Sequence, residues 1–253
     1  MGNPAFTPEE LQRLKDTVLL LEKYKFSDAF GDTAGALQKV IDVIDIGIQE
    51  DAADARDFIS PEKIPHIKGS EYLAAIIRAI KKKEVIRIYY QPFYEDKPYF
   101  VEIHPYLLKE YKHRWYLLGL NDFKKQLRTY SLDRIRDIQQ SDLSYEDRSI
   151  QASEYFKNSI GIIAPAGNPP RIKIAVQKTQ AQYMITQAWH DSQNIEEETE
   201  DEVIFSFRIH PTYELISLLL SYGKDLRVLE PESLKESMFS QLEAMREFYT
   251  DLE

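Results

Sequence analysis

The 253-residue sequence has no cysteine and only nine glycines. Without cysteine it can form neither a disulfide scaffold nor a Cys-ligated metal site, and this composition suits a reducing compartment. No apolar run approaches the roughly 20 residues that a membrane-spanning helix needs. The N-terminal residues 1–10 lack the basic and apolar regions of a signal peptide. We therefore expect a cytoplasmic protein that does not associate with membranes.

Catalytic motifs are also missing. The sequence contains no Gly-rich phosphate loop, no His-Glu-x-x-His helix and no Gly-x-Ser-x-Gly turn. Its five histidines are far apart and do not show metal-ligand spacing: His66, His104, His113, His190 and His210. We expect a protein that is not an enzyme and that carries no metal and no cofactor.

Charge is distributed unevenly along an acidic chain of formal net charge −10. Residues 191–202 contain seven acidic residues and no basic one. Residues 104–136 contain eight basic residues against three acidic ones, a local balance of +5. One basic segment in an acidic protein favours a local anion site over a general DNA-binding surface. The alternative is that the lysines of this segment are solvated loop residues.

Residues 99–140 predict three or four short strands that carry the candidate site. Because strand side chains alternate, a strand at 114–120 places Arg114 and Tyr116 on one face and Trp115 on the other, the core face. A strand at 127–132 places Arg128 and Tyr130 on one side, and Arg134 follows directly. Planar guanidiniums can grip phosphate oxygens through two parallel bonds. Arg128 and Arg134 are therefore the first candidates for ligand contact, unless each pairs with a carboxylate such as Asp133 or Asp137.

Aromatic residues surround these arginines in the sequence. Rings near guanidiniums commonly hold nucleotides and single-stranded nucleic acids by stacking. Cross-strand packing is the alternative role for such rings. The candidates for ligand contact are Tyr90, His104, Tyr106, Tyr116 and Tyr130, with Arg114 beside them.

An ordered set of motifs runs through this region. It comprises Ile88-Tyr89-Tyr90, His104-Pro105-Tyr106, Trp115-Tyr116-Leu117, Arg128 and the Leu132–Ile135 segment. The set resembles the WYL-domain proteins, a family of bacterial ligand-responsive transcriptional regulators. The resemblance implies a small five-stranded Sm-like or SH3-like β-barrel. It also implies a negatively charged effector: a nucleotide, a cyclic dinucleotide or a short single-stranded nucleic acid.

The expected fold class is α+β with several segments. Residues 1–69 predict two amphipathic helices, at 7–26 and 37–48, and a linker; 70–146 predict a helix at 70–83 followed by the barrel. After a linker at 147–170, residues 171–253 alternate as β-α-β-α-β-α. That order is compatible with a ferredoxin-like domain, and it resembles the C-terminal extension that often follows WYL domains.

Regulators of the WYL family usually begin with a winged helix-turn-helix. The helices expected before residue 50 have few basic residues to meet phosphate, so we expect DNA binding only through a helix-turn-helix not present in this chain. We expect a homodimer, formed by the C-terminal domain and its last helix. Two alternatives stay open: direct binding of RNA or single-stranded DNA by an Sm-like barrel, and a protein-interaction adaptor without a small ligand, with its arginines closed in ion pairs.

Overall fold

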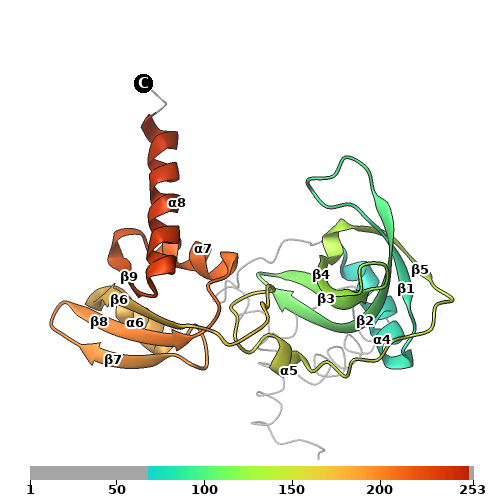
Figure 1. Cartoon of the computed structure of the whole chain (residues 1–253), viewed down its shortest axis with the longest axis horizontal. Coiled ribbons are helices and arrows are strands. Elements are labelled where there is room, and N and C mark those ends of the chain that lie inside the picture. Colours follow the sequence, from blue (N-terminus) through green and yellow to red (C-terminus); the bar gives the residue numbers. More distant parts are fainter. Residues whose placement is uncertain (1–67, 251–253) are drawn as a thin grey trace, which may run out of the picture. The chain divides into compact units, whose positions relative to one another are not determined.

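The structure, a computed structural model, describes residues 68–250. The chain divides into two compact units, Met1–Ser149 and Ile150–Glu253, which are described separately here. Figure 1 shows the helices and strands of both units. The helices expected at 7–26 and 37–48, and the linker up to residue 67, lie outside the described residues.

A helix opens the described part of the first unit, as expected. A 3-10 turn, η2 (Ser70–Tyr72), leads into α4 (Leu73–Lys82). Leu73, Ile76 and Ala79 recur at helical spacing and are buried against the sheet. Lys81 and Lys82 lie in the last turn, where cations favour the negative end of the helix dipole.

Five antiparallel strands follow, in the order β4-β3-β2-β1-β5. Their bounds are β1 (Ile86–Tyr90), β2 (Tyr99–Tyr111), β3 (Arg114–Asn121), β4 (Gln126–Ser131) and β5 (Ile135–Gln140). β2 is much longer than the pattern at 100–103 predicts, because a register shift between Pro105 and Leu107 lets the strand bend and continue. The inner face of the sheet, including Ile88, Ile103 and Leu117, packs on α4 as one core.

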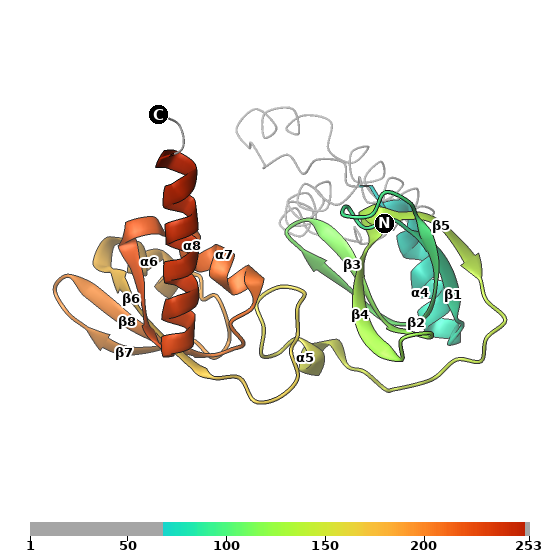
Figure 2. The same cartoon turned by 45° about the horizontal axis from the view of Figure 1, so that its top comes forward.

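The expectation of a closed barrel is corrected by the strand order. β4 pairs only with β3 and β5 only with β1 among the described strands, so the sheet stays open between them. Figure 2 shows how strongly this open sheet curves. The short turn η3 (Leu132–Arg134) carries the chain from β4 to β5. Gly69, at φ 97°, approaches the backbone of η3 so closely that a Cβ would lie 2.3 Å from the Leu132 carbonyl carbon.

A four-stranded antiparallel sheet forms the second unit, in the order β7-β8-β6-β9. Its elements are α5 (Ala152–Tyr155), β6 (Arg171–Gln177), α6 (Lys178–Thr186), β7 (Asn194–Glu198), β8 (Glu202–Arg208), α7 (Tyr213–Ser221), β9 (Leu226–Glu230) and α8 (Glu232–Thr250). The expected alternation of strands and helices is present, with β7 added. The ferredoxin-like assignment stays a prediction.

The edge strand β7 lies within the acidic segment 191–202. It pairs with β8, and Glu196 forms ion pairs with Arg171 and, at 3.3 Å, with Lys173 on β6. A hydrogen bond from Ser206, together with Arg171, lowers the pKa of Glu196 to about 2. The strand has little apolar alternation, so its sequence resembles a loop, and cross-strand ion pairs stabilise it instead.

The last helix, α8, packs on its own unit only near its start. Leu234 is buried and Met238 is partly packed against the core of the second unit. The same stripe continues through Leu242, Met245 and Tyr249, which are exposed. Within residues 68–250 we find no helix with the length and apolarity required to cross a bilayer.

Candidate anion-binding surface

The register of four strands brings aromatic rings and a guanidinium together on the inner face of the first sheet. Tyr90 on β1 lies opposite Tyr99 on β2. Arg128 and Tyr130 are two residues apart on β4, so their side chains lie on the same face of that strand. The ring centroids of Tyr90 and Tyr130 are 5.3 Å apart, and those of Tyr90 and Tyr99 are 6.4 Å apart, both edge to face. We call Tyr90, Tyr99 and Tyr130 the tyrosine cluster.

Arg128 is the cation of this face that is open to solvent. Its side chain is exposed, and it makes no ion pair and no hydrogen bond with any residue of the described range 68–250. Burial raises the pKa values of both Tyr99 and Tyr130, and the positive charge of Arg128 opposes that rise in each case. The positive charge of Arg128 is therefore felt at both phenols.

Arg134 lies on the other side of Tyr90. Its guanidinium carbon is 4.2 Å from the centroid of the exposed Phe93 ring, a cation–π contact. Its Nε is buried and has no hydrogen-bond partner among the residues described, and the nearest carboxylate oxygen, from Asp133, is 3.9 Å away. Burial raises the pKa of Tyr90, while the charge of Arg134 opposes the rise. This Nε is enclosed by the protein, whereas 29% of the Arg134 side chain is exposed, so an anion would meet the terminal guanidinium nitrogens.

Two other arginines of the basic segment are already engaged. Arg114 forms an ion pair with Asp133, which also accepts a hydrogen bond from the Ser131 hydroxyl. Arg114 is thus closed in an ion pair. Of the two arginines for which carboxylate pairing was the alternative, Arg134 has a long contact of 3.9 Å with Asp133, and Arg128 has none within residues 68–250. Arg136 donates to the Gln91 side chain over 3.2 Å.

Three of the predicted aromatic contacts lie apart from the tyrosine cluster. Tyr116 is on the opposite face of β3 from the buried Leu117. His104 is 1% exposed, and both its ring nitrogens are bonded inside the unit. The Tyr106 hydroxyl donates to the Glu146 carbonyl oxygen over 2.7 Å. Tyr90, Tyr130, Arg128 and Arg134 are brought together, whereas Arg114, His104, Tyr106 and Tyr116 are not.

Two residues of this surface were missed by the sequence analysis. Tyr99 faces Tyr90 because the hairpin 91–98 returns the chain in that register. Asn121, expected in a polar turn, ends β3 and donates from its side chain to the Tyr130 hydroxyl over 2.9 Å. The position of Tyr99 could have been predicted from the pairing of two segments, Ile88-Tyr89-Tyr90 and Tyr99-Phe100-Val101. The register of that pairing depends on the length of the hairpin, which the sequence pattern does not define.

Other kinds of site find no support near these residues. No group of three metal-ligating side chains occurs within residues 68–250. A shallow hollow of about 410 Å³ lies along α8 and is lined by none of the predicted residues; its lining is Glu232, Lys235, Glu236, Phe239, Ser240 and Glu243.

Two family models match the chain, one in each unit. Residues 71–140 match the WYL domain, and residues 168–246 match the WCX domain. This chain belongs to the WYL-domain family. The tyrosine cluster, Arg128 and Arg134 all lie within its WYL domain, between η2 and the end of β5. The tryptophan of the name-giving triplet, Trp115, packs against the core of that domain, so its role is structural.

Two solved structures resemble this WYL–WCX chain remotely. Proteasome accessory factor B/C (PafBC) of Arthrobacter aurescens is 18% identical with a TM-score of 0.29; the match covers 74% of this chain and 27% of that one. A protein described as CRISPR Cas-related is 15% identical with a TM-score of 0.45, over 73% of this chain and 54% of that one. This chain thus spans about a quarter and about half of their lengths. No curated protein matches its sequence.

Proposed function

We propose that this chain is the effector-sensing part of a WYL-type transcriptional regulator. Its WYL domain would bind a nucleotide, a cyclic dinucleotide or a short single-stranded nucleic acid through Arg128, Arg134 and the tyrosine cluster. DNA would be contacted by a helix-turn-helix outside this chain. Family membership supports the regulatory role, and binding without catalysis is the proposed activity.

The observation that carries the proposal is the exposed guanidinium of Arg128 near Tyr99 and Tyr130, two rings of the tyrosine cluster. A phosphate at this position would accept charge-assisted hydrogen bonds from Arg128, and the partly exposed guanidinium of Arg134 adds a second positive charge. The exposed parts of Tyr99 and Phe93 offer surfaces on which a base can stack. Phosphate and base would thus be recognised by neighbouring groups of one face.

The proposal is tested by a thermal-shift screen with mononucleotides, cyclic dinucleotides and short single strands, followed by titration of the compound that stabilises the protein most. For Arg128→Ala/Arg134→Ala we expect the affinity for that compound to fall by roughly 100-fold or more, because two charge-assisted contacts are lost. The melting temperature of the free protein should change by only a few degrees. Arg128 makes no ion pair or hydrogen bond within residues 68–250, and Arg134 contributes the Phe93 ring contact, a hydrogen bond to Tyr90 and a 3.9 Å ion pair with Asp133.

Arg78→Ala is the matched control. Arg78 is an exposed arginine on α4 of the same domain, so its loss changes the net charge without touching the tyrosine cluster. Affinity should stay within about twofold of the wild type, a change expected for distant, exposed sites. Equal binding by the double-arginine variant and the wild type would refute the assignment.

One alternative is direct binding of longer RNA or single-stranded DNA. The Phe93 ring, 73% exposed beneath Arg134, favours it, because ring and guanidinium together form a stacking platform. Affinity would then grow with oligonucleotide length and fall steeply with salt. The adaptor alternative required Arg128 and Arg134 to be closed in ion pairs. Arg134 has a 3.9 Å ion pair with Asp133, whereas Arg128 has none within residues 68–250.

We also propose that the chain forms a homodimer through α8. The free part of its apolar stripe, Leu242, Met245 and Tyr249, has no cover in the second unit. Arg246 flanks this stripe, while Glu236 and Glu243 lie on the opposite, polar face of the helix, so the apolar side chains are free to meet a second copy. A second copy of α8 is the occupant that this pattern fits.

A further inference from the structure

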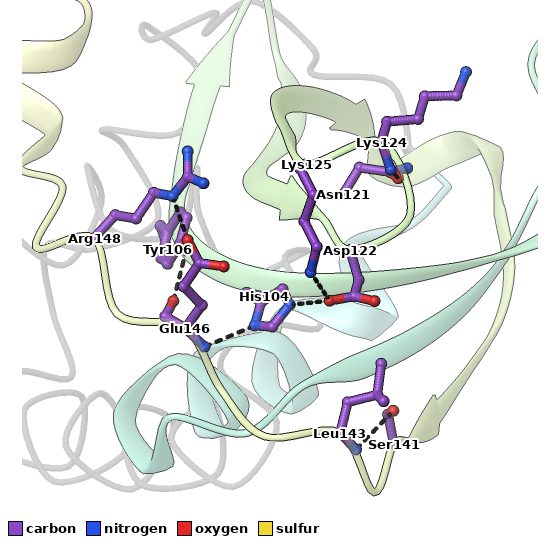
Figure 3. Close-up of polar contacts among 10 residues, drawn as sticks. All are labelled: His104, Tyr106, Asn121, Asp122, Lys124, Lys125, Ser141, Leu143, Glu146 and Arg148. Atoms are coloured by element: carbon purple, nitrogen blue, oxygen red, sulfur yellow. Dashed lines mark hydrogen bonds and ion pairs between the residues drawn. The ribbon is translucent and has the colours of Figure 1, made fainter.

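A buried histidine that contacts no part of the tyrosine cluster lies between two segments of the WYL unit. The backbone N–H of Glu146 donates to His104 Nδ1 over 2.9 Å, so Nδ1 carries no proton. Nε2 therefore carries the hydrogen and donates to Asp122 Oδ1 over 3.0 Å. Figure 3 shows the imidazole between these two partners. Each partner constrains one edge of a ring that is 1% exposed.

The Asp122 side of the ring leads to the tyrosine cluster. Asp122 follows Asn121 directly, and Asn121 donates to the Tyr130 hydroxyl over 2.9 Å and accepts from the Lys124 backbone N–H over 2.7 Å. Lys125 donates to the same carboxylate oxygen as His104, over 2.7 Å. A displacement of Tyr130 by a ligand would therefore act on the turn that positions Asp122.

The Glu146 side leads to the segment 141–149, which we call the strap. The strap has no regular secondary structure and continues into the second unit at Ile150. Side chains hold it to the WYL unit: the Tyr106 hydroxyl donates to the Glu146 carbonyl oxygen over 2.7 Å, and Lys83 pairs with Asp147 at 2.5 Å. The Tyr145 hydroxyl donates to the Pro105 carbonyl oxygen over 2.8 Å. Burial raises the pKa values of Tyr106 and Tyr145 to about 12, so both hydroxyls remain donors at neutral pH.

We propose that His104 is a positioning residue that couples occupancy of the tyrosine cluster to the strap. The proposal rests on the proposed ligand surface. A ligand that shifts Tyr130 changes the fit of Asp122 to Nε2, and the rigid ring transmits the change to the Glu146 N–H. The strap is thereby held or released at the point where the chain leaves the WYL unit. Such coupling requires that the ligand prefer one of the two arrangements.

Two substitutions each break the hydrogen bond between His104 and Asp122 and leave the Glu146 N–H with an acceptor. His104→Asn places a side-chain oxygen where Nδ1 lies, so the Glu146 N–H keeps an acceptor while the bond to Asp122 is lost. Asp122→Ala removes the same bond from the other partner, on a residue whose side chain is 29% exposed and whose loss leaves the core intact. If either variant fails to fold, the other still cuts the proposed link.

The test alters Tyr130 and measures the response of the strap in the absence of ligand. Tyr130→Phe removes the acceptor of Asn121, and hydrogen exchange of the Glu146 amide is measured by NMR on the full chain. We expect exchange to accelerate about fivefold in the otherwise native protein, and less than about twofold when Tyr130→Phe is added to His104→Asn or Asp122→Ala. Tyr89→Phe, on the opposite face of β1, should leave the Glu146 amide unchanged.

Equal acceleration by Tyr130→Phe with and without the His104 link would overturn the coupling, because the effects would then be additive. No acceleration in the native background would overturn it as well. Both results are independent of ligand binding, so failure of the coupling is distinguishable from failure of the proposed ligand surface.

Discussion

At the scale of single residues, Asp133 decides which arginines of the WYL domain are open to an anion. It is paired with Arg114 and lies 3.9 Å from Arg134 Nε, too far for a hydrogen bond. Arg128, on the next strand, is beyond its direct reach and stays unpaired within the described range. At the proposed site, the negative charge of Asp133 would therefore compete with a phosphate for Arg114 and Arg134.

This competition predicts the effect of Asp133→Asn. The amide keeps an oxygen that can accept from Ser131, but it removes the charge beside Arg114 and Arg134. We expect an anionic effector found by the screen to bind about twofold to fivefold more tightly, a size typical of a partly screened charge. Isothermal titration would measure it. Asp137→Asn, an exposed carboxylate on β5, is the control, and unchanged or weaker binding by Asp133→Asn would contradict the competition.

At the scale of elements, each unit has one feature that its own core does not explain. In the WYL unit it is the strap, which side chains rather than a ladder of backbone bonds hold in place. In the second unit it is α8, whose apolar stripe extends beyond the sheet that buries Leu234. Both features therefore lie outside the hydrophobic core of their own unit.

The α8 stripe predicts the result of a sedimentation experiment. Leu242→Glu puts a charge in the centre of the proposed helix pair, and we expect the dimer to dissociate into monomers because an unpaired charge would be buried there. Ser240→Glu adds the same charge on the polar face of α8 between Glu236 and Glu243, and this control should remain dimeric. A monomeric wild type, or a dimeric Leu242→Glu variant, would contradict self-association through this stripe.

At the scale of the whole molecule, the sequence determines most elements directly. α4 and the strands β1, β3, β4, β6, β8 and β9 follow from apolar periodicity, and their observed bounds lie close to the expected ones. β7 was not predictable in this way, because its stability depends on Glu196 meeting Arg171 and Lys173 from a strand about twenty residues earlier. The open sheet could not be predicted from the sequence either, because β4 and β5 are adjacent in sequence but occupy opposite edges of the sheet.

The proposed site was predicted in part, for a related reason. Alternation placed Arg128 with Tyr130 correctly, because both lie on one strand. The partners of Arg114 and His104 come from other segments, so the sequence could not show that one is paired with Asp133 and the other is bonded to Asp122 and Glu146. Tyr99 depended on the register of a hairpin whose length the pattern left open.

The most direct test is an NMR titration of the full chain with the best-binding phosphate-bearing compound from the screen. Ring signals of Tyr90, Tyr99 and Tyr130 should shift in proportion to occupancy, and Arg128→Ala should abolish these shifts while Arg78→Ala retains them. Saturable binding that leaves the three rings unmoved, or that moves them equally in Arg128→Ala, would contradict an anion site at this surface.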